Sequence, residues 1–268
     1  IEIRNKTIGI IGYGHVGSQV SILAEAFGMK VIYYDIKNIM NLGNSVKCET
    51  LDELLKKSDF VTCHVPLYET TENLISENQL KKMKKGSYLL NLSRGKVVDI
   101  VSLKKYLDNK HLYGAALDVY PEEPSKNGEY TNILQNTYNV ILTPHIGGST
   151  KEAQTHIAED VCSKINMFLY EGITSSSVNL PSIEQNKVQK INCFTIFNIH
   201  KNISGVMSKI NNIIMNYGSN IVSSNLSTFK DIGVSRISLN GNNTNKQIIE
   251  EIKNEIELLE YNIKTRIL

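Results

Sequence analysis

An arginine, a histidine and a run of acids could together carry out acid–base chemistry on a carboxylic acid. Arg94 lies in Asn91-Leu-Ser-Arg-Gly95, where a guanidinium can hold a carboxylate through two parallel, charge-assisted hydrogen bonds. It is one of two arginines, against fifteen lysines, in the first 148 residues, which favours a need for its forked geometry. His145 lies in Thr143-Pro-His-Ile-Gly-Gly148, between a predicted strand and two glycines. An acid from Asp118-Val-Tyr-Pro-Glu-Glu-Pro124 could orient its ring and stabilise the imidazolium, which makes a general acid–base pair.

A second motif predicts a dinucleotide-binding loop. The sequence Gly12-Tyr-Gly14-His-Val-Gly17 follows an apolar run and opens a predicted helix. Gly12 can make the tight turn, Gly14 lets a pyrophosphate approach the backbone, and Gly17 allows close packing of helix and sheet. Asp35 follows the next apolar run, where a carboxylate accepts both ribose hydroxyls and repels a 2′-phosphate. The pattern therefore predicts NAD rather than NADP; the alternative is a fold that uses these glycines only for packing.

These residues require a sheet that brings strand ends together. Short apolar runs alternate with amphipathic stretches, which is typical of a doubly wound parallel sheet covered on both faces. The predicted strands are Thr7–Ile11, Lys30–Tyr34, Phe60–His64, Tyr88–Leu92, Gly114–Val119 and Val140–Leu142. The predicted helices between them are Gly14–Phe27, Leu51–Lys57, Glu77–Lys82 and Val101–Asn109.

The remainder of the chain has a different rhythm. Residues 150–170 show helical spacing of apolar side chains, and Gly172–Ser177 indicates a hinge. The last segment predicts the order βαββαβ of a ferredoxin-like fold. Its elements are Ile191–Ile199, Gly205–Tyr217, Asn220–Thr228, Gly233–Leu239, Lys246–Leu258 and Asn262–Leu268. We therefore expect an α/β chain with a nucleotide domain at 1–148, a returning helix and linker at 149–190, and a small domain at 191–268.

The composition excludes several classes of partner. The 268 residues carry 29 basic and 27 acidic side chains, a net charge of +2, which is too balanced for a protein that coats nucleic acid or a membrane surface. Phe194 and Phe197 are three residues apart, so they face opposite sides of a strand and cannot stack bases together. No apolar run approaches the ~18 residues of a membrane span. The four cysteines fit no metal-binding spacing, so we expect reduced thiols, no metal and a cytoplasmic protein.

The ordered motifs resemble those of the D-isomer-specific 2-hydroxyacid dehydrogenases. The glycine loop, Asp35, His64-Val-Pro66, the Ser-Arg-Gly motif, the Asp-Val-x-x-x-Glu-Pro motif and Thr-Pro-His-Ile-Gly-Gly occur in the family's order. The resemblance implies that Arg94 binds the substrate carboxylate, that His145 is the acid–base residue and that Glu123, rather than Glu122, supports it. It also implies that Asp118 contacts the nicotinamide amide. The implied NAD-binding set is Gly12, Gly14, His15, Val16, Gly17, Asp35, Pro66, Leu92, Ser93, Arg94, Asp118, His145, Gly147 and Gly148.

The final segment resembles an ACT domain, a module that binds amino acids and regulates biosynthetic enzymes. Serine-inhibited members of the dehydrogenase family carry such a module at this position. The resemblance implies an L-serine site formed by His200, Asn202 and Asn220, shared between two chains of a homo-oligomer, which is a tetramer in similar enzymes. Ile203-Ser204 departs from the proline that often precedes the loop glycine. A purely structural dimerisation domain is the alternative.

Three functions compete at this stage. The first is an oxidoreductase for a phosphorylated 2-hydroxy acid with amino-acid feedback. The second is another 2-hydroxyacid dehydrogenase, for example one that reduces 2-oxoglutarate, and the third is a non-enzymatic protein that senses NAD on the same scaffold. The family forms its substrate lobe mainly from residues upstream of the nucleotide domain. We therefore expect this chain to be a fragment that closes the site poorly.

Overall fold

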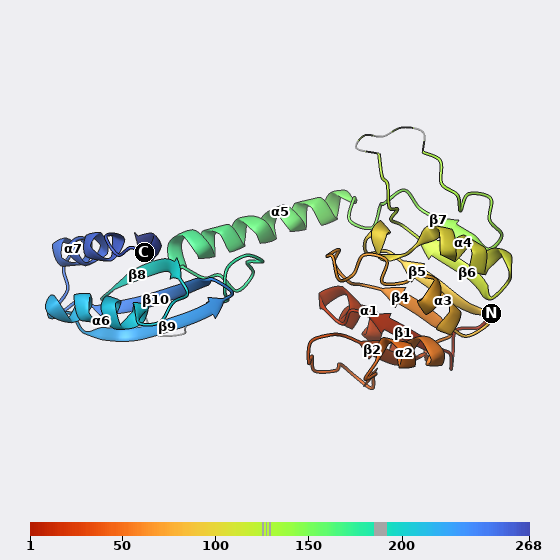
Figure 1. The fold of residues 1–268 in the computed structure, drawn as a ribbon, viewed down its shortest axis with the longest axis horizontal. Helices are drawn as coiled ribbons and strands as arrows, with labels where there is room; N and C mark the ends of the chain where they lie inside the picture. Colours follow the sequence, from red (N-terminus) through yellow and green to blue (C-terminus); the bar gives the residue numbers. More distant parts are fainter. Residues whose placement is uncertain (125, 127, 129, 185–191) are drawn as a thin grey trace. The chain divides into compact units, whose positions relative to one another are not determined.

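The computed structural model describes residues 1–124, 126, 128, 130–184 and 192–268, and it divides into two compact units. The first unit is Ile1–Lys151 and the second is Glu152–Leu268. Figure 1 shows a parallel sheet flanked by helices in the first unit and a separate antiparallel sheet in the second. The start of the last predicted domain, Ile191, and most of the linker before it lie outside the described residues.

The first unit contains a seven-stranded parallel sheet in the order β3-β2-β1-β4-β5-β6-β7. Its chain order reverses between β1 and β4, which is the topological switch point of a doubly wound fold. The strands are β1 Thr7–Ile11, β2 Lys30–Tyr34, β3 Val46–Lys47, β4 Phe60–Cys63, β5 Ser87–Asn91, β6 Leu112–Leu117 and β7 Val140–Leu142. The helices are α1 His15–Ala26, α2 Leu51–Lys57, α3 Glu77–Lys82 and α4 Ile100–Asp108, with a 3-10 turn at Gly95–Val97.

Two apolar layers enclose this sheet. Ile8 and Ile10 of β1 pack with α1 on one face. Gly9 and Ile11 face the other side, where α2, α3 and α4 contribute Leu54, Leu80, Leu103 and their neighbours. The sequence predicts a sheet covered by helices on both faces, but the α1 face is partly open at β7. Val140 and Leu142 face the α2–α4 layer, so Ile141 between them faces the α1 side, where it is 66% exposed.

The predicted elements are largely confirmed, and the differences have local causes. Strand β3 is absent from the prediction because a two-residue strand shows no period in sequence. The expected end of β5 at Leu92 is wrong, because the strand stops at Asn91, whose side chain accepts a hydrogen bond from the Ser93 backbone. Strand β6 begins at Leu112, directly after a turn in which Lys110 has a positive φ of 58°.

The second unit contains the predicted βαββαβ order. Its strands are β8 Cys193–Lys201, β9 Ile221–Phe229, β10 Ile232–Asn240 and β11 Asn262–Ile267, arranged as β11-β8-β10-β9. The helices α6 Val206–Asn216 and α7 Lys246–Glu257 pack on one face against Ile196 and Ile237. Phe194 packs on that face and Phe197 on the other, which confirms that the two rings are separated by the sheet.

The segment that precedes this sheet is attached to it. Helix α5, Lys151–Asn166, continues into a π-helical turn at Met167–Glu171. Its last carbonyl groups accept hydrogen bonds from two sheet arginines, Glu171 from Arg236 at 2.8 Å and Phe168 from Arg266 at 3.1 Å. The expected hinge, Gly172–Ser177, is therefore not a free connection. Within it, Ile173 and Thr174 are 6% and 2% exposed.

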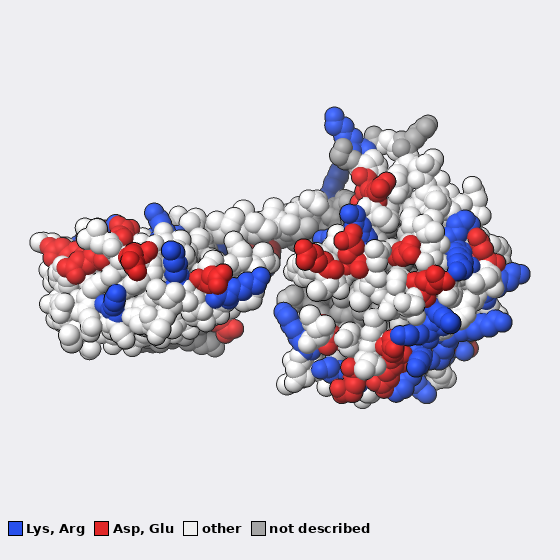
Figure 2. All heavy atoms as spheres, viewed as in Figure 1, with Lys and Arg blue, Asp and Glu red and all other residues white. Residues whose placement is uncertain are grey.

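The surface charge is mixed. Figure 2 shows basic and acidic side chains side by side on the visible face of both units. Several lysines of the first unit are paired with acids, as in Lys57–Glu53, Lys82–Asp52 and Lys84–Asp59. Within the part of the chain that the structure describes, every helix is too short or too polar to cross a membrane.

Candidate active site and effector site

The predicted site residues of the first unit gather at one edge of the parallel sheet. All seven strands run in the same direction, so their carboxyl ends meet at this edge. The glycine loop follows β1, Asp35 follows β2, Pro66 follows β4, Leu92–Arg94 follow β5, Asp118 follows β6 and Thr143–Gly148 follow β7. The fold therefore places residues that are far apart in sequence along one edge.

The three positions of the loop require glycine for different physical reasons. Gly12 has a φ of +90°, and a β-carbon there would lie 2.7 Å from the His64 carbonyl oxygen. A β-carbon at Gly17 would lie 2.1 Å from the Gly12 carbonyl oxygen. Gly14 faces open space at the start of α1, with exposed His15 and Val16 beside it. Two glycines thus shape the turn, and the third leaves room where backbone N–H groups can meet a phosphate.

Asp35 is held beside this loop by backbone donors. One carboxylate oxygen accepts a hydrogen bond from the Tyr13 N–H at 2.8 Å, and the other accepts one from the Lys37 N–H at 2.8 Å. A carboxylate has about four acceptor positions, so each oxygen retains capacity for a ribose hydroxyl. This arrangement fits the adenosine ribose of NAD.

His145 and Glu123 form a close pair. The His145 Nδ1 atom lies 2.6 Å from a Glu123 carboxylate oxygen, and the two side chains are 49% and 31% exposed. The second Glu123 oxygen accepts a hydrogen bond from the Tyr120 N–H at 2.8 Å, which fixes the carboxylate. Because Nδ1 faces the carboxylate, the Nε2 atom is the one available to exchange a proton with a ligand. The histidine has a positive φ of 53°, a backbone conformation that is uncommon for residues other than glycine but that histidine adopts more often than most.

Asp118 holds the loop that carries His145. Its carboxylate accepts hydrogen bonds from the Thr143 hydroxyl at 2.5 Å, the Ile146 N–H at 3.0 Å and the Gly147 N–H at 2.9 Å. Burial alone would raise the pKa of the Asp118 carboxyl, but these three hydrogen bonds and the nearby His145 lower it below its usual value. The charged aspartate therefore binds residues on both sides of His145, the Thr143 hydroxyl before it and the Ile146 and Gly147 N–H groups after it.

Arg94 lies at the same edge with its side chain exposed. Its guanidinium donates to the Ser93 carbonyl at 2.6 Å, and Ser93 in turn is held by the Asn91 side chain at 3.1 Å. Leu92 is 51% exposed, and Pro66 and Gly148 are also exposed. In the described part of the chain, no hydrogen bond joins Arg94 to His145.

Several supporting residues are absent from the sequence-based prediction. The Tyr120 hydroxyl donates to the Thr143 carbonyl at 2.8 Å and so joins the segment after β6 to the segment after β7. A β-carbon at Gly95 would lie 1.9 Å from the Tyr120 carbonyl, so Gly95 allows this close approach. Burial lowers the pKa of His64, whose ring is within 3.0 Å of the Thr62 hydroxyl. The glycine after Arg94 is the one sequence signal that could have indicated Tyr120.

The three predicted effector residues are not brought together within one chain. His200 is 2% exposed and its Nδ1 atom contacts the Asn198 side-chain oxygen at 2.8 Å, while burial lowers its pKa. Asn202 is exposed and donates to the Lys230 carbonyl. His200 of β8 pairs with Gly233, near the start of β10. The Asn220 carbonyl accepts a hydrogen bond from the Asn240 N–H, at the opposite end of β10. Gly233 and Asn240 are seven residues apart along β10, which corresponds to about 23 Å.

The fold and the site define a dinucleotide-binding dehydrogenase domain followed by a ferredoxin-like module. Residues 1–147 match the NAD binding domain of the D-isomer specific 2-hydroxyacid dehydrogenase family, and residues 196–264 match an AHAS small subunit-like ACT domain. Because the first match covers more than half of the chain, the protein belongs to the D-isomer specific 2-hydroxyacid dehydrogenase family.

Curated relatives and solved structures agree with this family. The chain is 49% identical over 268 residues to "D-3-phosphoglycerate dehydrogenase" of Dictyostelium discoideum, covering 100% of this chain and 64% of the relative. It is 44% identical over 233 residues to the Escherichia coli K12 protein of that name, covering 87% of this chain and 56% of the relative. A D-isomer specific 2-hydroxyacid dehydrogenase from Lactobacillus delbrueckii, in an NAD-complexed form, superposes with a TM-score of 0.57 at 34% identity, covering 64% of this chain and 55% of that one.

Proposed function

We propose that this chain carries the cofactor and regulatory parts of an NAD-dependent D-3-phosphoglycerate dehydrogenase. The reaction is oxidation of 3-phospho-D-glycerate to 3-phosphohydroxypyruvate, the first step of L-serine biosynthesis. The observation that carries the proposal is the 2.6 Å His145–Glu123 pair at the edge that also holds the glycine loop. Similarity to D-3-phosphoglycerate dehydrogenases supports the substrate, and the chain spans 64% and 56% of the two relatives described above.

The roles of the residues follow from their positions. NAD supplies the hydride acceptor when it is bound. We assign to Arg94 the substrate carboxylate, which its exposed guanidinium can hold through paired hydrogen bonds. His145 removes the hydroxyl proton at Nε2 and returns it in the reverse direction, while Glu123 stabilises the imidazolium. Asp35 would accept the ribose hydroxyls. The backbone N–H groups at the start of α1 would hold the pyrophosphate, and Asp118 would contact the nicotinamide amide.

Oxidation of NADH tests the substrate and the roles together. The natural polypeptide that contains this sequence should oxidise NADH with 3-phosphohydroxypyruvate faster than with 2-oxoglutarate. His145→Ala and Arg94→Ala should each lose most turnover while NADH still binds. A faster reaction with 2-oxoglutarate would favour another dehydrogenase. NADH binding without turnover of either acid would favour an NAD-sensing protein, and an active His145→Ala variant would contradict the assignment.

Serine feedback is the regulatory part of the proposal. The separation of Asn220 from His200 within one chain supports a site that takes Asn220 from a second chain of a homo-oligomer. Serine should inhibit the natural enzyme, and Asn202→Ala should abolish that inhibition with little change in uninhibited rate. Inhibition that persists in the variant would remove Asn202 from the site.

The division of the chain also belongs to the proposal. We assign residues 1–148 to the cofactor domain, 149–190 to a returning helix and linker, and 191–268 to the ACT domain. Residues 196–264 match an ACT domain, which supports the assignment of the last segment. A cytoplasmic location is supported by the four cysteines, all of which are free thiols. Fractionation of cells would test it.

A further inference from the structure

Residues 36–45, here named the Asp35 loop, connect β2 to β3 without regular secondary structure. The loop begins directly after the carboxylate assigned to the adenosine ribose. Two of its apolar side chains, Ile36 and Met40, are 89% and 85% exposed. A loop with so few buried side chains needs other contacts to keep one conformation, because ordering each backbone residue opposes folding.

The Tyr13 hydroxyl provides the central contact. It lies 2.6 Å from the Ser21 hydroxyl of α1 and 2.8 Å from the Ser45 hydroxyl at the end of the Asp35 loop. It also accepts a hydrogen bond from the Leu42 N–H at 3.2 Å. The Tyr13 ring is 1% exposed and stacks on the Tyr33 ring with 3.8 Å between centroids. The side chain between two loop glycines therefore joins the glycine loop, α1 and the Asp35 loop.

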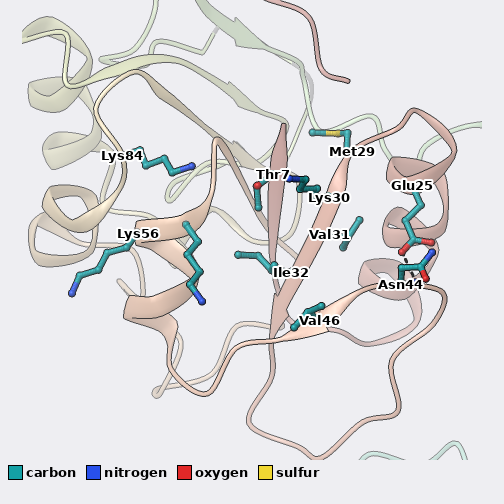
Figure 3. Close-up of a pocket in the computed structure, with 11 residues that line it drawn as sticks. Thr7, Glu25, Met29, Lys30, Val31, Ile32, Asn44, Val46, Lys56 and Lys84 are labelled. Carbon is teal, nitrogen blue, oxygen red and sulfur yellow. Dashed lines mark hydrogen bonds between the residues drawn. The ribbon is translucent and has the colours of Figure 1, made fainter. Parts of the chain in front are cut away.

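Two further hydrogen bonds join the Asp35 loop to groups outside it. The Tyr33 hydroxyl donates to the Ile39 carbonyl at 3.0 Å. The Asn44 N–H donates to the Glu25 carboxylate of α1 at 2.7 Å, as the dashed line in Figure 3 shows. Both residues line a cavity of about 680 Å³ near the start of β1 and β2, as does Lys56. Figure 3 shows these lining residues. Groups outside the loop thus hold it at Ile39, Leu42, Asn44 and Ser45.

We propose that Tyr13 is a positioning residue for the cofactor, whose hydroxyl holds the Asp35 loop in the conformation that receives the adenosine half of the dinucleotide. Its N–H orients the Asp35 carboxylate, and its hydroxyl fixes the loop that follows, so one residue shapes both parts of the subsite. This inference rests on the proposed function, because it assumes that NAD binds at the glycine loop. A loop that must be ordered on binding lowers affinity, so a rigid loop increases it.

The change Tyr13→Phe tests the proposal, since it keeps the stacked ring and removes the hydroxyl. The Leu42 N–H then loses its acceptor. NADH and ADP-ribose are titrated into the 268-residue chain, and both dissociation constants should rise by the same factor, about 5- to 20-fold, the effect of one or two lost hydrogen bonds. Hydrogen exchange of the Asp35 loop should be faster in the variant. Tyr138→Phe, at a ring that is 91% exposed, is the matched control and should change neither value.

Ser45→Ala is the second variant, because it removes one partner from the same network with less disturbance of the fold. It should weaken both ligands by about 2- to 5-fold, and Tyr13→Phe should add less in the Ser45→Ala chain than in the wild type, because one of the partners of the hydroxyl is already absent. Unchanged affinities in both variants would overturn the inference, as would a loss for NADH but not for ADP-ribose. A wild-type chain that binds neither ligand would overturn the proposed function and this inference with it.

Discussion

Asp118 should contribute strongly to the stability of the first unit, and Asp118→Asn measures that contribution. In the variant the amide oxygen can still accept from Thr143 and Ile146. The amide nitrogen then faces the Gly147 N–H, which was bonded to the carboxylate at 2.9 Å, so this donor loses its partner. An orphaned buried donor costs about 1–3 kcal/mol, and the remaining bonds lose their charge assistance. We expect a loss of about 3 kcal/mol in the free energy of unfolding.

Calorimetry provides the measurement. For a unit of this size, about 3 kcal/mol corresponds to a fall in Tm of roughly 6–12 °C. Only the transition of the first unit should move, because Asp118 lies in Ile1–Lys151 and the other unit has its own core. Asp108→Asn is the matched control, since its carboxylate is a surface partner of Lys104 at 3.0 Å and exposed pairs contribute little.

The dependence on pH gives a second, independent check. The pKa of the Asp118 carboxyl is lower in the folded chain than its ordinary value of 3.8. A depressed pKa contributes stability that is complete above the unfolded pKa and is lost as pH falls through the folded pKa. The difference between wild type and Asp118→Asn should therefore be constant from pH 7 to about pH 5 and should shrink below about pH 4. A difference below 0.5 kcal/mol at neutral pH, or one that persists at pH 2, would refute this reasoning.

Three further predictions follow from close contacts. Gly14→Ala should leave Tm unchanged and abolish NADH binding, because nothing lies within 4 Å of the new β-carbon except the proposed ligand space; Gly17→Ala should lower Tm, because its β-carbon meets backbone at 2.1 Å. Calorimetry and NADH titration distinguish the two. Gly172→Ala should destabilise the second unit by about 2 kcal/mol, because the residue has a φ of +67° and two apolar side chains within 2.7 Å; a urea titration measures this. The hydrogen bond to Glu255 raises the pKa of Tyr217 to about 12, so Glu255→Gln should lower it in an ultraviolet titration.

The sequence predicts the order of the nucleotide domain well because each step is local. Neighbouring residues determine strand β1, the turn at Gly12 and the start of α1. The need for a glycine at φ +90° can therefore be predicted from the residues around Gly12. Strand β3 cannot be predicted in this way, because its two residues are defined only by pairing with Ile32 and Tyr33 of β2. A similar limit applies to Tyr120, which supports His145 through the Glu123 carboxylate and whose contact with Gly95 is visible only in the fold.

The expected hinge shows how composition can mislead. Small and polar residues at Gly172–Ser177 favour a flexible connection when the neighbours in space are unknown. In the structure, Gly172 is required because a β-carbon would meet Phe197 and Leu268 at 2.7 Å, and the Thr174 hydroxyl donates to the Pro181 carbonyl at 2.6 Å. Small residues are therefore placed here for close packing on a sheet, and the chain's division into two units falls at Lys151 instead.

The effector residues show what a motif omits. His200, Asn202 and Asn220 match a pattern of residue types, but the pattern carries no distance. The register of β8, β10 and β9 places His200 and Asn220 at opposite ends of one sheet, so no rotation of side chains can bring both to one small amino acid. If a serine contacts both residues, the two must come from different chains. An effector site of this composition then binds only when the chains are associated, which makes inhibition and oligomerisation thermodynamically linked: serine should favour the associated state, and dilution should weaken serine binding.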